Sequence, residues 1–187
     1  MVRAYLAMSL DGFIAGADDD LSWLEPARAS GVPFATGAWA ASPSQGMEFG
    51  DFLAGVGCIL MGRRTYDVVA GFDDWPYGDI PMVVATHRGL RDAREGVIGA
   101  GGSIAELVAR ARELAGDRDV YVDGGTMVRT ALAGGALEHL IVTVVPTVLG
   151  SGVPLFAGMP HAADLTVERV ARYGGGLVQV HLACGRG

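Results

Sequence analysis

Short apolar runs recur along the chain and predict buried strands. They cover residues 2–8, 56–61, 82–85, 120–123 and 140–145. Each run is rich in Val, Ile, Leu or Met without polar alternation, which is typical of strands that are covered on both faces of a sheet. The pattern therefore favours a largely parallel sheet that lies between two layers of helices.

Helical and hairpin patterns fill much of the remaining chain. Ser103 and Glu106 form a possible capping box at the start of the clearest helix, whose apolar residues recur at helical spacing until Gly116. Residues 165–173 and 177–182 flank three glycines, and the second segment alternates apolar and polar residues. These two segments predict an antiparallel hairpin.

Together the elements predict an α/β fold with three layers: a twisted, mainly parallel sheet, an antiparallel C-terminal hairpin, and helices on both faces. We expect one domain over residues 1–187, which is long enough to bury a core without disulfides or metal. Residues 47–53 predict a short helix. Residues 27–46 show no period, and connections of this length are typically lids or mobile segments.

The composition excludes several classes of function. The formal net charge is −7, so binding to nucleic acid or to anionic membranes is not expected. All 14 basic residues are arginines, which excludes Schiff-base chemistry on lysine and the lysine of a P-loop. Any bound phosphate must therefore meet a local cluster of arginine side chains.

Cysteine usage and hydropathy predict a cytoplasmic protein. Cys58 lies inside an apolar run and Cys184 lies close to the end of the chain, so neither suggests a disulfide framework. The apolar stretch at residues 4–10 is broken by Asp11 and is too short for the core of a signal peptide. No apolar segment approaches the length of a membrane span.

One local device occurs twice: an apolar strand runs into glycine and then into a threonine that can open a helix. We call the two copies the first and second glycine nodes; they comprise Gly62, Arg63, Arg64 and Thr65, and Gly124, Gly125 and Thr126. Glycine lets a ligand approach the backbone, and the first amides of a helix offer unpaired donors. On neighbouring strands the nodes could hold a pyrophosphate, although a plain tight turn explains each node equally well.

Thr86, His87 and Arg88 follow the run at residues 82–85, so they should lie at the same end of the sheet as the glycine nodes. With Arg64 they could hold an adenosine 2′-phosphate, because guanidinium binds phosphate bidentately. Such a cluster would select NADPH over NADH. The alternative is that these arginines are solvated surface charges.

Asp123 ends an apolar run directly before two glycines, so its carboxylate is expected at the mouth of the site; a helix-capping role is an equal alternative. Trp23 is either a pocket wall or a core residue, and Asp11 is expected in a turn. The histidines and cysteines lack metal-ligand spacing, and neither a G-x-S-x-G elbow nor a P-loop is present. A metal site, a hydrolase and a kinase are therefore not expected.

Four stretches, taken in order, resemble the dihydrofolate reductase superfamily. The resemblance is closest to the C-terminal reductase domain of the bifunctional riboflavin-biosynthesis deaminase-reductase and to its stand-alone bacterial relatives. The stretches are AMSLDGFIA at 7–15, LMGRRTY at 60–66, VDGGT at 122–126 and VPTVLGSGVPLF at 145–156. The resemblance as a whole extends over nearly the full chain.

The resemblance implies an NADPH site. Residues 9–15 would form a loop that closes over the nicotinamide. The resemblance places the nicotinamide carboxamide at Ala7 and Ile14, and the adenosine at Thr86, His87 and Arg88. The pyrophosphate and the 2′-phosphate would be held by Gly62, Arg63, Arg64, Thr65, Gly124, Gly125 and Thr126.

On the substrate side, Asp123 stands where the riboflavin enzymes carry an acid, and it would supply a proton or anchor the substrate, directly or through a water. Glu48 and Asp51 lie near the place where dihydrofolate reductases carry a carboxylate on the first helix. Trp23 and Phe156 would wall the pocket.

We therefore expect an NADPH-dependent reductase that transfers hydride to a small heterocyclic or sugar-pyrimidine substrate, resembling 5-amino-6-(5-phosphoribosylamino)uracil reductase. The alternatives are folate reduction of the dihydrofolate reductase type and a non-catalytic nucleotide-binding module. The riboflavin enzymes also carry an aspartate a helical turn after the threonine of a strand-helix junction, where this chain has Val69. The stand-alone relatives suggest a homodimer, with residues 140–145 as a contact.

Overall fold

The computed structural model describes residues 1–24, 46–90, 93–173 and 177–185. The expected lid at residues 27–46 falls, except for Gly46, outside the described residues. The elements follow one another along the chain as β1 (Val2–Ser9), β2 (Phe13–Ala15), η1 (Ala17–Asp19), α2 (Phe49–Ala54), β3 (Val56–Gly62), α3 (Arg63–Ala70), β4 (Met82–Ala85), β5 (Val97–Ala100), α4 (Ile104–Ala115), β6 (Asp119–Asp123), α5 (Gly125–Ala133), β7 (His139–Val145), β8 (Val153–Pro154), β9 (Leu165–Tyr173) and β10 (Leu177–Cys184).

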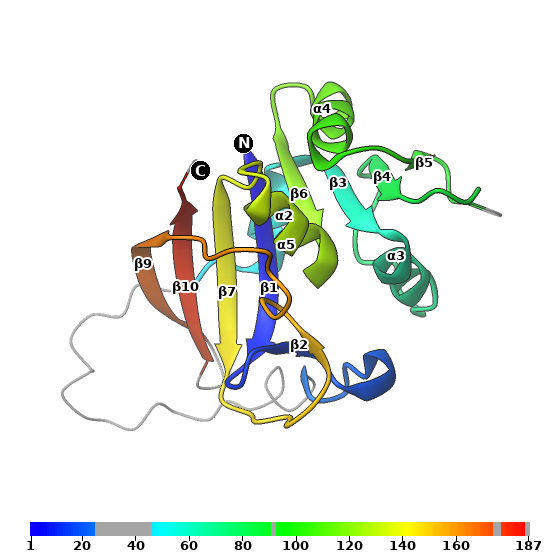
Figure 1. The fold of residues 1–187 in the computed structure, drawn as a ribbon. Helices are drawn as coiled ribbons and strands as arrows, with labels where there is room; N and C mark the ends of the chain where they lie inside the picture. The colour runs from blue at the N-terminus through cyan, green and yellow to red at the C-terminus, as the bar shows by residue number, and fades with distance from the viewer. Residues whose placement is uncertain (25–45, 91–92, 174–176, 186–187) are drawn as a thin grey trace.

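One twisted sheet organises the molecule (Figure 1). Its eight strands lie in the order β5-β4-β3-β6-β1-β7-β10-β9. All pairs from β5 to β7 are parallel, and β10 pairs antiparallel with both β7 and β9. The mainly parallel sheet with an antiparallel C-terminal hairpin is confirmed, and a separate two-stranded sheet of β2 and β8 adds to it.

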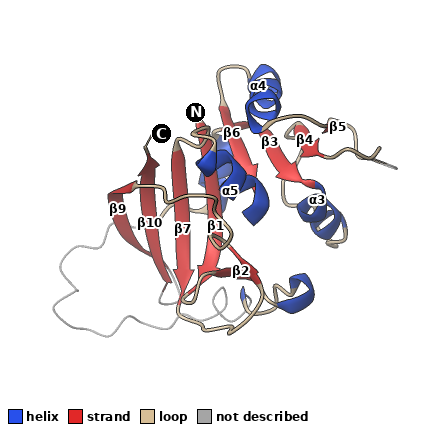
Figure 2. Ribbon diagram, in the orientation of Figure 1, coloured by secondary structure: helices blue, strands red, loops and turns tan. Residues whose placement is uncertain are grey.

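Helices cover both faces of the sheet, as the pattern predicts (Figure 2). On one face the buried residues of α4 and α5 pack against alternate strand residues such as Leu60 and Val122. On the other face α2 and α3 pack against the intervening residues, including Ile59 and Tyr121. Because strand side chains alternate between faces, a residue's place in its strand decides which of the two cores it joins.

The helix starts also follow from the sequence. Ser103 caps α4 by accepting a hydrogen bond from the Glu106 amide, and the Glu106 side chain binds back to the cap residue. The expected capping box is therefore confirmed. In the described part of the chain, no helix has the length and apolarity needed to cross a membrane.

Candidate cofactor and substrate site

Strand pairing places the two glycine nodes side by side. β3 and β6 are parallel neighbours, with Met61 opposite Asp123, so the glycine that follows each residue leaves the sheet at the same level. Ala85 pairs with Gly62 on the other side of β3, which brings the end of β4 to the same edge. The ends of β4, β3 and β6 thus form a continuous row at the edge where ligands bind in open parallel sheets.

The two nodes are in direct contact through Gly124. Its φ of +85° is in the left-handed region, and a Cβ at this position would lie 2.2 Å from Thr65 Oγ1. A side chain is therefore excluded both by the backbone conformation and by the neighbouring node. Behind these glycines α3 and α5 begin, at Arg63 and Gly125, so two helix N-termini point toward the same edge.

The loop after β1 leads into β2, and β2 covers the second node. A Cβ on Gly125 would lie 2.8 Å from Ile14 Cδ1, so Ile14 packs directly on this glycine. Arg129, on α5, donates hydrogen bonds to the carbonyl oxygens of Pro154 (2.6 Å) and Leu155 (3.1 Å), which ties α5 to β8. β2 and β8, which pair with each other, thus both contact the second node and its helix.

Asp11 fixes the shape of this loop. Its carboxylate accepts hydrogen bonds from Ser9 Oγ (2.7 Å) and from the backbone amides of Leu149 (3.1 Å) and Gly150 (2.7 Å). The hydrogen bond from Ser9 is the main cause that holds the pKa of Asp11 below its ordinary value. Asp11 is thus a turn residue that joins two loops, as its sequence context predicts.

The arginines at the first node differ in their ion pairs. Arg63 Nε donates to both oxygens of Asp67 at 2.7 and 2.9 Å, four residues along α3. Arg64 Nε donates to Asp19 at 2.8 Å, which links α3 to η1. Arg88, by contrast, forms no ion pair with any residue of the described ranges and is exposed. Among Arg63, Arg64 and Arg88, Arg88 is thus the one whose charge is not paired with an acidic side chain of the described residues.

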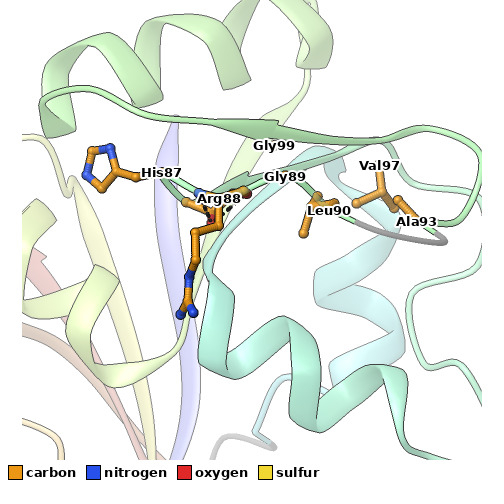
Figure 3. Close-up of a pocket in the computed structure, with 8 residues that line it drawn as sticks. His87, Arg88, Gly89, Leu90, Ala93, Val97 and Gly99 are labelled. Carbon is orange, nitrogen blue, oxygen red and sulfur yellow. Dashed lines mark hydrogen bonds between the residues drawn. The ribbon is translucent and has the colours of Figure 1, made fainter.

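Two pockets meet at the end of β4. The larger has a volume of about 380 Å³ and the smaller about 190 Å³, and Thr86 and His87 line both. Leu90 and Val97 lie in the larger pocket, and His87 and Arg88 point away from them (Figure 3). The smaller pocket lies on the face of the sheet that α4 and α5 cover. The expected adenosine residues therefore do line a cavity beside the glycine nodes.

Asp123 points into the core rather than toward open solvent. Only 7% of the residue is exposed, on the face of the sheet that carries α2 and α3. Its Oδ2 accepts a hydrogen bond from the Tyr77 hydroxyl, and its Oδ1 accepts one from the Gly124 amide at 2.8 Å. The expectation of a carboxylate at the mouth of the site needs correction, because the aromatic side chains beside Asp123 enclose it.

Burial dominates the protonation of Asp123. Removal from water raises its pKa, and hydrogen bonds from Tyr77, Tyr121 and Gly124 oppose that rise. The same burial, with the Asp123 charge nearby, raises the pKa of the Tyr77 phenol. Asp123 is thus the kind of carboxyl group that can stay protonated at a higher pH than an exposed aspartate.

The other expected substrate residues do not gather around Asp123. Glu48 is the residue before α2 and Asp51 lies in its first turn, and both are exposed. Trp23 is buried against Val145 and Leu177, next to Ala7. Phe156 packs with the α4 and α5 core, across the sheet from Asp123, so Trp23 and Phe156 do not wall one pocket.

Sequence reasoning missed Tyr77 and Arg129. Tyr77 lies in the connection between α3 and β4 and is 5% exposed. A signal was available, because two aromatic residues, Trp75 and Tyr77, lie between aspartates, with Asp74 before them and Asp79 after them. Arg129 gave no such signal, since its backbone partners come from β8 and are set only by the fold. No group of His, Cys, Asp or Glu in the described part of the chain could hold a metal ion.

The chain belongs to the RibD C-terminal domain family, whose model matches residues 1–179. Among curated proteins it is 29% identical over 178 residues to the uncharacterized protein YwjB of Bacillus subtilis (strain 168), over 95% of this chain and 94% of that protein. The resemblance inferred from the four sequence stretches is thereby confirmed.

Solved structures support the same fold. A protein attributed to riboflavin biosynthesis in Shewanella sp. PV-4 aligns with a TM-score of 0.79 and 27% identity, over 99% of both chains. A bifunctional deaminase and 5-amino-6-(5-phosphoribosylamino)uracil reductase from Thermotoga maritima aligns over 99% of this chain and 56% of its own, with a TM-score of 0.64 and 14% identity. At that identity the second likeness concerns the fold alone.

Proposed function

We propose that the chain is an NADPH-dependent reductase of a small heterocyclic substrate. The observation that carries the proposal is the direct contact of two glycine nodes at one edge of the sheet, with Gly124 against Thr65. Two helix N-termini, a row of backbone amides and the exposed Arg88 accompany this contact. An acidic chain that concentrates these features at one edge is suited to a phosphorylated cofactor.

The residues present fit such a cofactor. The absence of a side chain on Gly124 lets the second node pack directly against Thr65 of the first node, which brings the two strand-helix junctions together at one place. Gly62, Arg63, Arg64, Thr65, Gly125 and Thr126 would complete the diphosphate site, with Thr86, His87 and Arg88 at the adenosine end and Ala7 and Ile14 at the nicotinamide. When bound, the cofactor would supply the hydride.

The chain itself would supply a proton and exclude water. Reduction of a C=N or C=O bond needs a proton on the heteroatom after hydride reaches the carbon. Asp123, directly or through a water, is the buried acid nearest to the second node, because it precedes Gly124 and binds its amide. A carboxyl group with a raised pKa is suited to this role near neutral pH.

The substrate class rests on the family and on the surroundings of Asp123. The Shewanella relative is attributed to riboflavin biosynthesis. A sugar-pyrimidine such as 5-amino-6-(5-phosphoribosylamino)uracil is therefore the first substrate to test. Trp23, Glu48 and Asp51 remain proposed substrate residues on the Asp123 side of the sheet. Phe156 lies on the α4 and α5 face of the sheet, opposite Asp123, and is not proposed as a substrate residue.

Two measurements test the function. NADPH fluorescence titrated with protein should show saturable binding, with NADH bound more weakly. NADPH oxidation should then be followed with 5-amino-6-(5-phosphoribosylamino)uracil, with dihydrofolate, and with simple imines and ketones. If neither NADPH nor NADH binds, the proposal is wrong. Tight NADPH binding without NADPH oxidation by any substrate of the panel would favour a non-catalytic binding module.

Arg88→Ala should weaken NADPH binding roughly tenfold to a hundredfold and leave NADH binding unchanged. The reason is the loss of a charge-assisted contact to the 2′-phosphate, worth about 1.5–3 kcal/mol. Fluorescence titration of both cofactors measures the effect, and Arg110→Ala is the matched control because Arg110 is an exposed arginine on α4. An equal loss of NADH binding would show that Arg88 does not read the 2′-phosphate.

We also propose a homodimer that uses the face of β7, β10 and β9 on the α4 and α5 side. Val178 pairs with Val144 and Val180 with Val170, so valines follow one another across this face. Val167 and Val170 are 59% and 55% exposed. Among the described elements, Figure 2 shows no helix in front of β9 and β10. A second copy of the chain would cover these apolar side chains.

Val180→Glu should therefore convert the dimer to a monomer, because it places a charge in the middle of this apolar face. Light scattering coupled to size-exclusion chromatography gives the mass directly. Leu114→Glu, at a 43% exposed leucine on α4, is the control and should remain dimeric. A wild-type protein that is monomeric at micromolar concentration would contradict the proposal.

A further inference from the structure

The most unusual polar group in the described core is the pair of Asp123 and Tyr77. Apart from Asp123, the buried polar residues of the described chain are Ser9, Thr143 and Gln179, which are neutral. Asp123 is thus the one buried carboxyl group among the described residues. Its Oδ2 accepts a hydrogen bond from a phenol that belongs to the connection between α3 and β4, 46 residues earlier in the chain.

The Tyr77 ring is held on several sides. Its centroid lies 5.4 Å from Trp75 in an edge-on arrangement, 6.5 Å from Phe49 and 6.4 Å from Tyr121. Trp75 is itself fixed, because its indole donates to the Gly78 carbonyl at 3.0 Å and Arg94 lies over its ring at 4.6 Å. The aromatic contacts therefore leave the phenol little freedom to move away from the carboxyl group.

The rest of this connection is more exposed. Phe72 is 42% exposed, and Asp73, Asp74 and Asp79 are also exposed. Tyr77, in contrast, is 5% exposed, so this side chain reaches inward from a polar surface segment. A hydrophobic side chain would fill the same space without offering a donor. The presence of a hydroxyl at this point is explained by the carboxyl group that it binds.

We propose that Tyr77 is a positioning residue for the reduction: its phenol orients the Asp123 carboxyl group, shields it from water and sets its readiness to give up a proton. This inference rests on the proposed function, in which Asp123 supplies the proton. Tyr77 itself need not touch the substrate.

The direction of the effect follows from the hydrogen bond. A phenol that donates to a carboxylate stabilises the ionised form, while burial favours the neutral form. The hydrogen bond from Tyr77 thus partly offsets the rise in the pKa of Asp123 that burial causes, so that Asp123 can hold a proton and still release it. Loss of the Tyr77 hydroxyl should leave Asp123 protonated to a higher pH, and it should allow the Asp123 carboxyl group to rotate about its Cβ–Cγ bond.

Titration of the carboxyl group tests the proposal without cofactor or substrate. The protein is labelled with 13C at the aspartate carboxyl carbons, and the Asp123 resonance is assigned by its loss in Asp123→Asn. In Tyr77→Phe the titration midpoint of this resonance should move to higher pH. Tyr66→Phe, which removes a hydroxyl from another buried tyrosine, on α3, should leave it unchanged. An unchanged midpoint in Tyr77→Phe would overturn the proposal.

A second variant covers the case in which Tyr77→Phe fails to fold. Site-specific 3-fluorotyrosine at position 77 keeps the ring and makes the phenol more acidic, hence a stronger donor, so the Asp123 midpoint should move to lower pH. No movement, or a movement to higher pH, would refute the role of Tyr77.

The same samples separate this proposal from the proposed function. NADPH titration of Tyr77→Phe should match that of the wild type, because Tyr77 lies outside the glycine nodes and both pockets. Failure of the wild type to bind NADPH would remove the reductase, while a shifted Asp123 midpoint would still establish the coupling of Tyr77 to Asp123. A normal midpoint together with NADPH binding would remove the positioning role alone.

Discussion

Gly124→Ala is expected to abolish measurable NADPH binding at micromolar protein and to destabilise the fold. A side chain at a φ of +85° costs on the order of 1–3 kcal/mol. The added methyl group would also lie 2.2 Å from Thr65 Oγ1 and 3.1 Å from Thr65 Cβ, so Thr65 and the first turn of α3 must shift. The free energy of unfolding, from chemical denaturation, and the NADPH titration measure the two effects.

Gly116→Ala is the matched control for the free-energy cost of a side chain at a positive φ. Gly116 has a φ of +60°, no atom lies within 4 Å of a Cβ built there, and it ends α4 away from the nodes. It should lose a similar share of stability and keep NADPH binding. In the double variant Gly124→Ala/Thr65→Ala, the removal of the Thr65 hydroxyl should restore part of the stability. Equal NADPH affinity in Gly124→Ala and wild type would show that the nodes do not hold the cofactor.

Asp123→Asn is expected to lower kcat/KM by about 100-fold or more while NADPH binding is retained. The estimate is the usual contribution of a general acid. Asparagine has nearly the same shape and can still accept a hydrogen bond from the Gly124 amide, so the node should keep its geometry. Steady-state kinetics with whichever substrate of the panel is turned over measures the loss, and Asp117→Asn, at an exposed aspartate, should leave the rate unchanged.

The same substitution should raise stability at neutral pH. The folded-state pKa of Asp123 is raised above its ordinary value by burial, so ionisation disfavours the folded state. Wild-type stability should therefore fall as pH rises from the ordinary aspartate pKa through the raised pKa, and should then level off. The gain from Asp123→Asn should vanish in acid, where the wild-type carboxyl is protonated in both states. A melting temperature below wild type at neutral pH would contradict this account.

Elements defined by a strong local pattern could be predicted from the sequence. The helix predicted to start after Ser103 and to stop at Gly116 is observed as Ile104–Ala115, and the helix predicted at residues 47–53 is observed as Phe49–Ala54. Two kinds of element escaped. β5 has only four residues, and one of them is glycine. β2 and β8 have three and two residues, which is too few to show a period of hydrophobic residues.

The adjacency of the two glycine nodes could be predicted because it depends on strand order, and the surroundings of Asp123 were missed because they depend on long-range packing. Parallel neighbours must end at the same edge, so the adjacency of Gly62 and Gly124 followed from one assumption about β3 and β6. The direction of the Asp123 side chain was missed, because it depends on which face of β6 the residue occupies. The partner of Asp123 comes from a connection without regular structure, and local sequence does not specify such a contact.

The position of β1 in the sheet has a consequence for how the chain matures. β1 comes first along the chain, yet it lies in the middle of the sheet, between β6 and β7. While the polypeptide is being made, its neighbours at residues 119–123 and 139–145 do not yet exist. This apolar segment therefore cannot pair with either neighbour until the ribosome has made residues 119–145, and such delayed, long-range pairing favours slow folding and exposure to aggregation or chaperones.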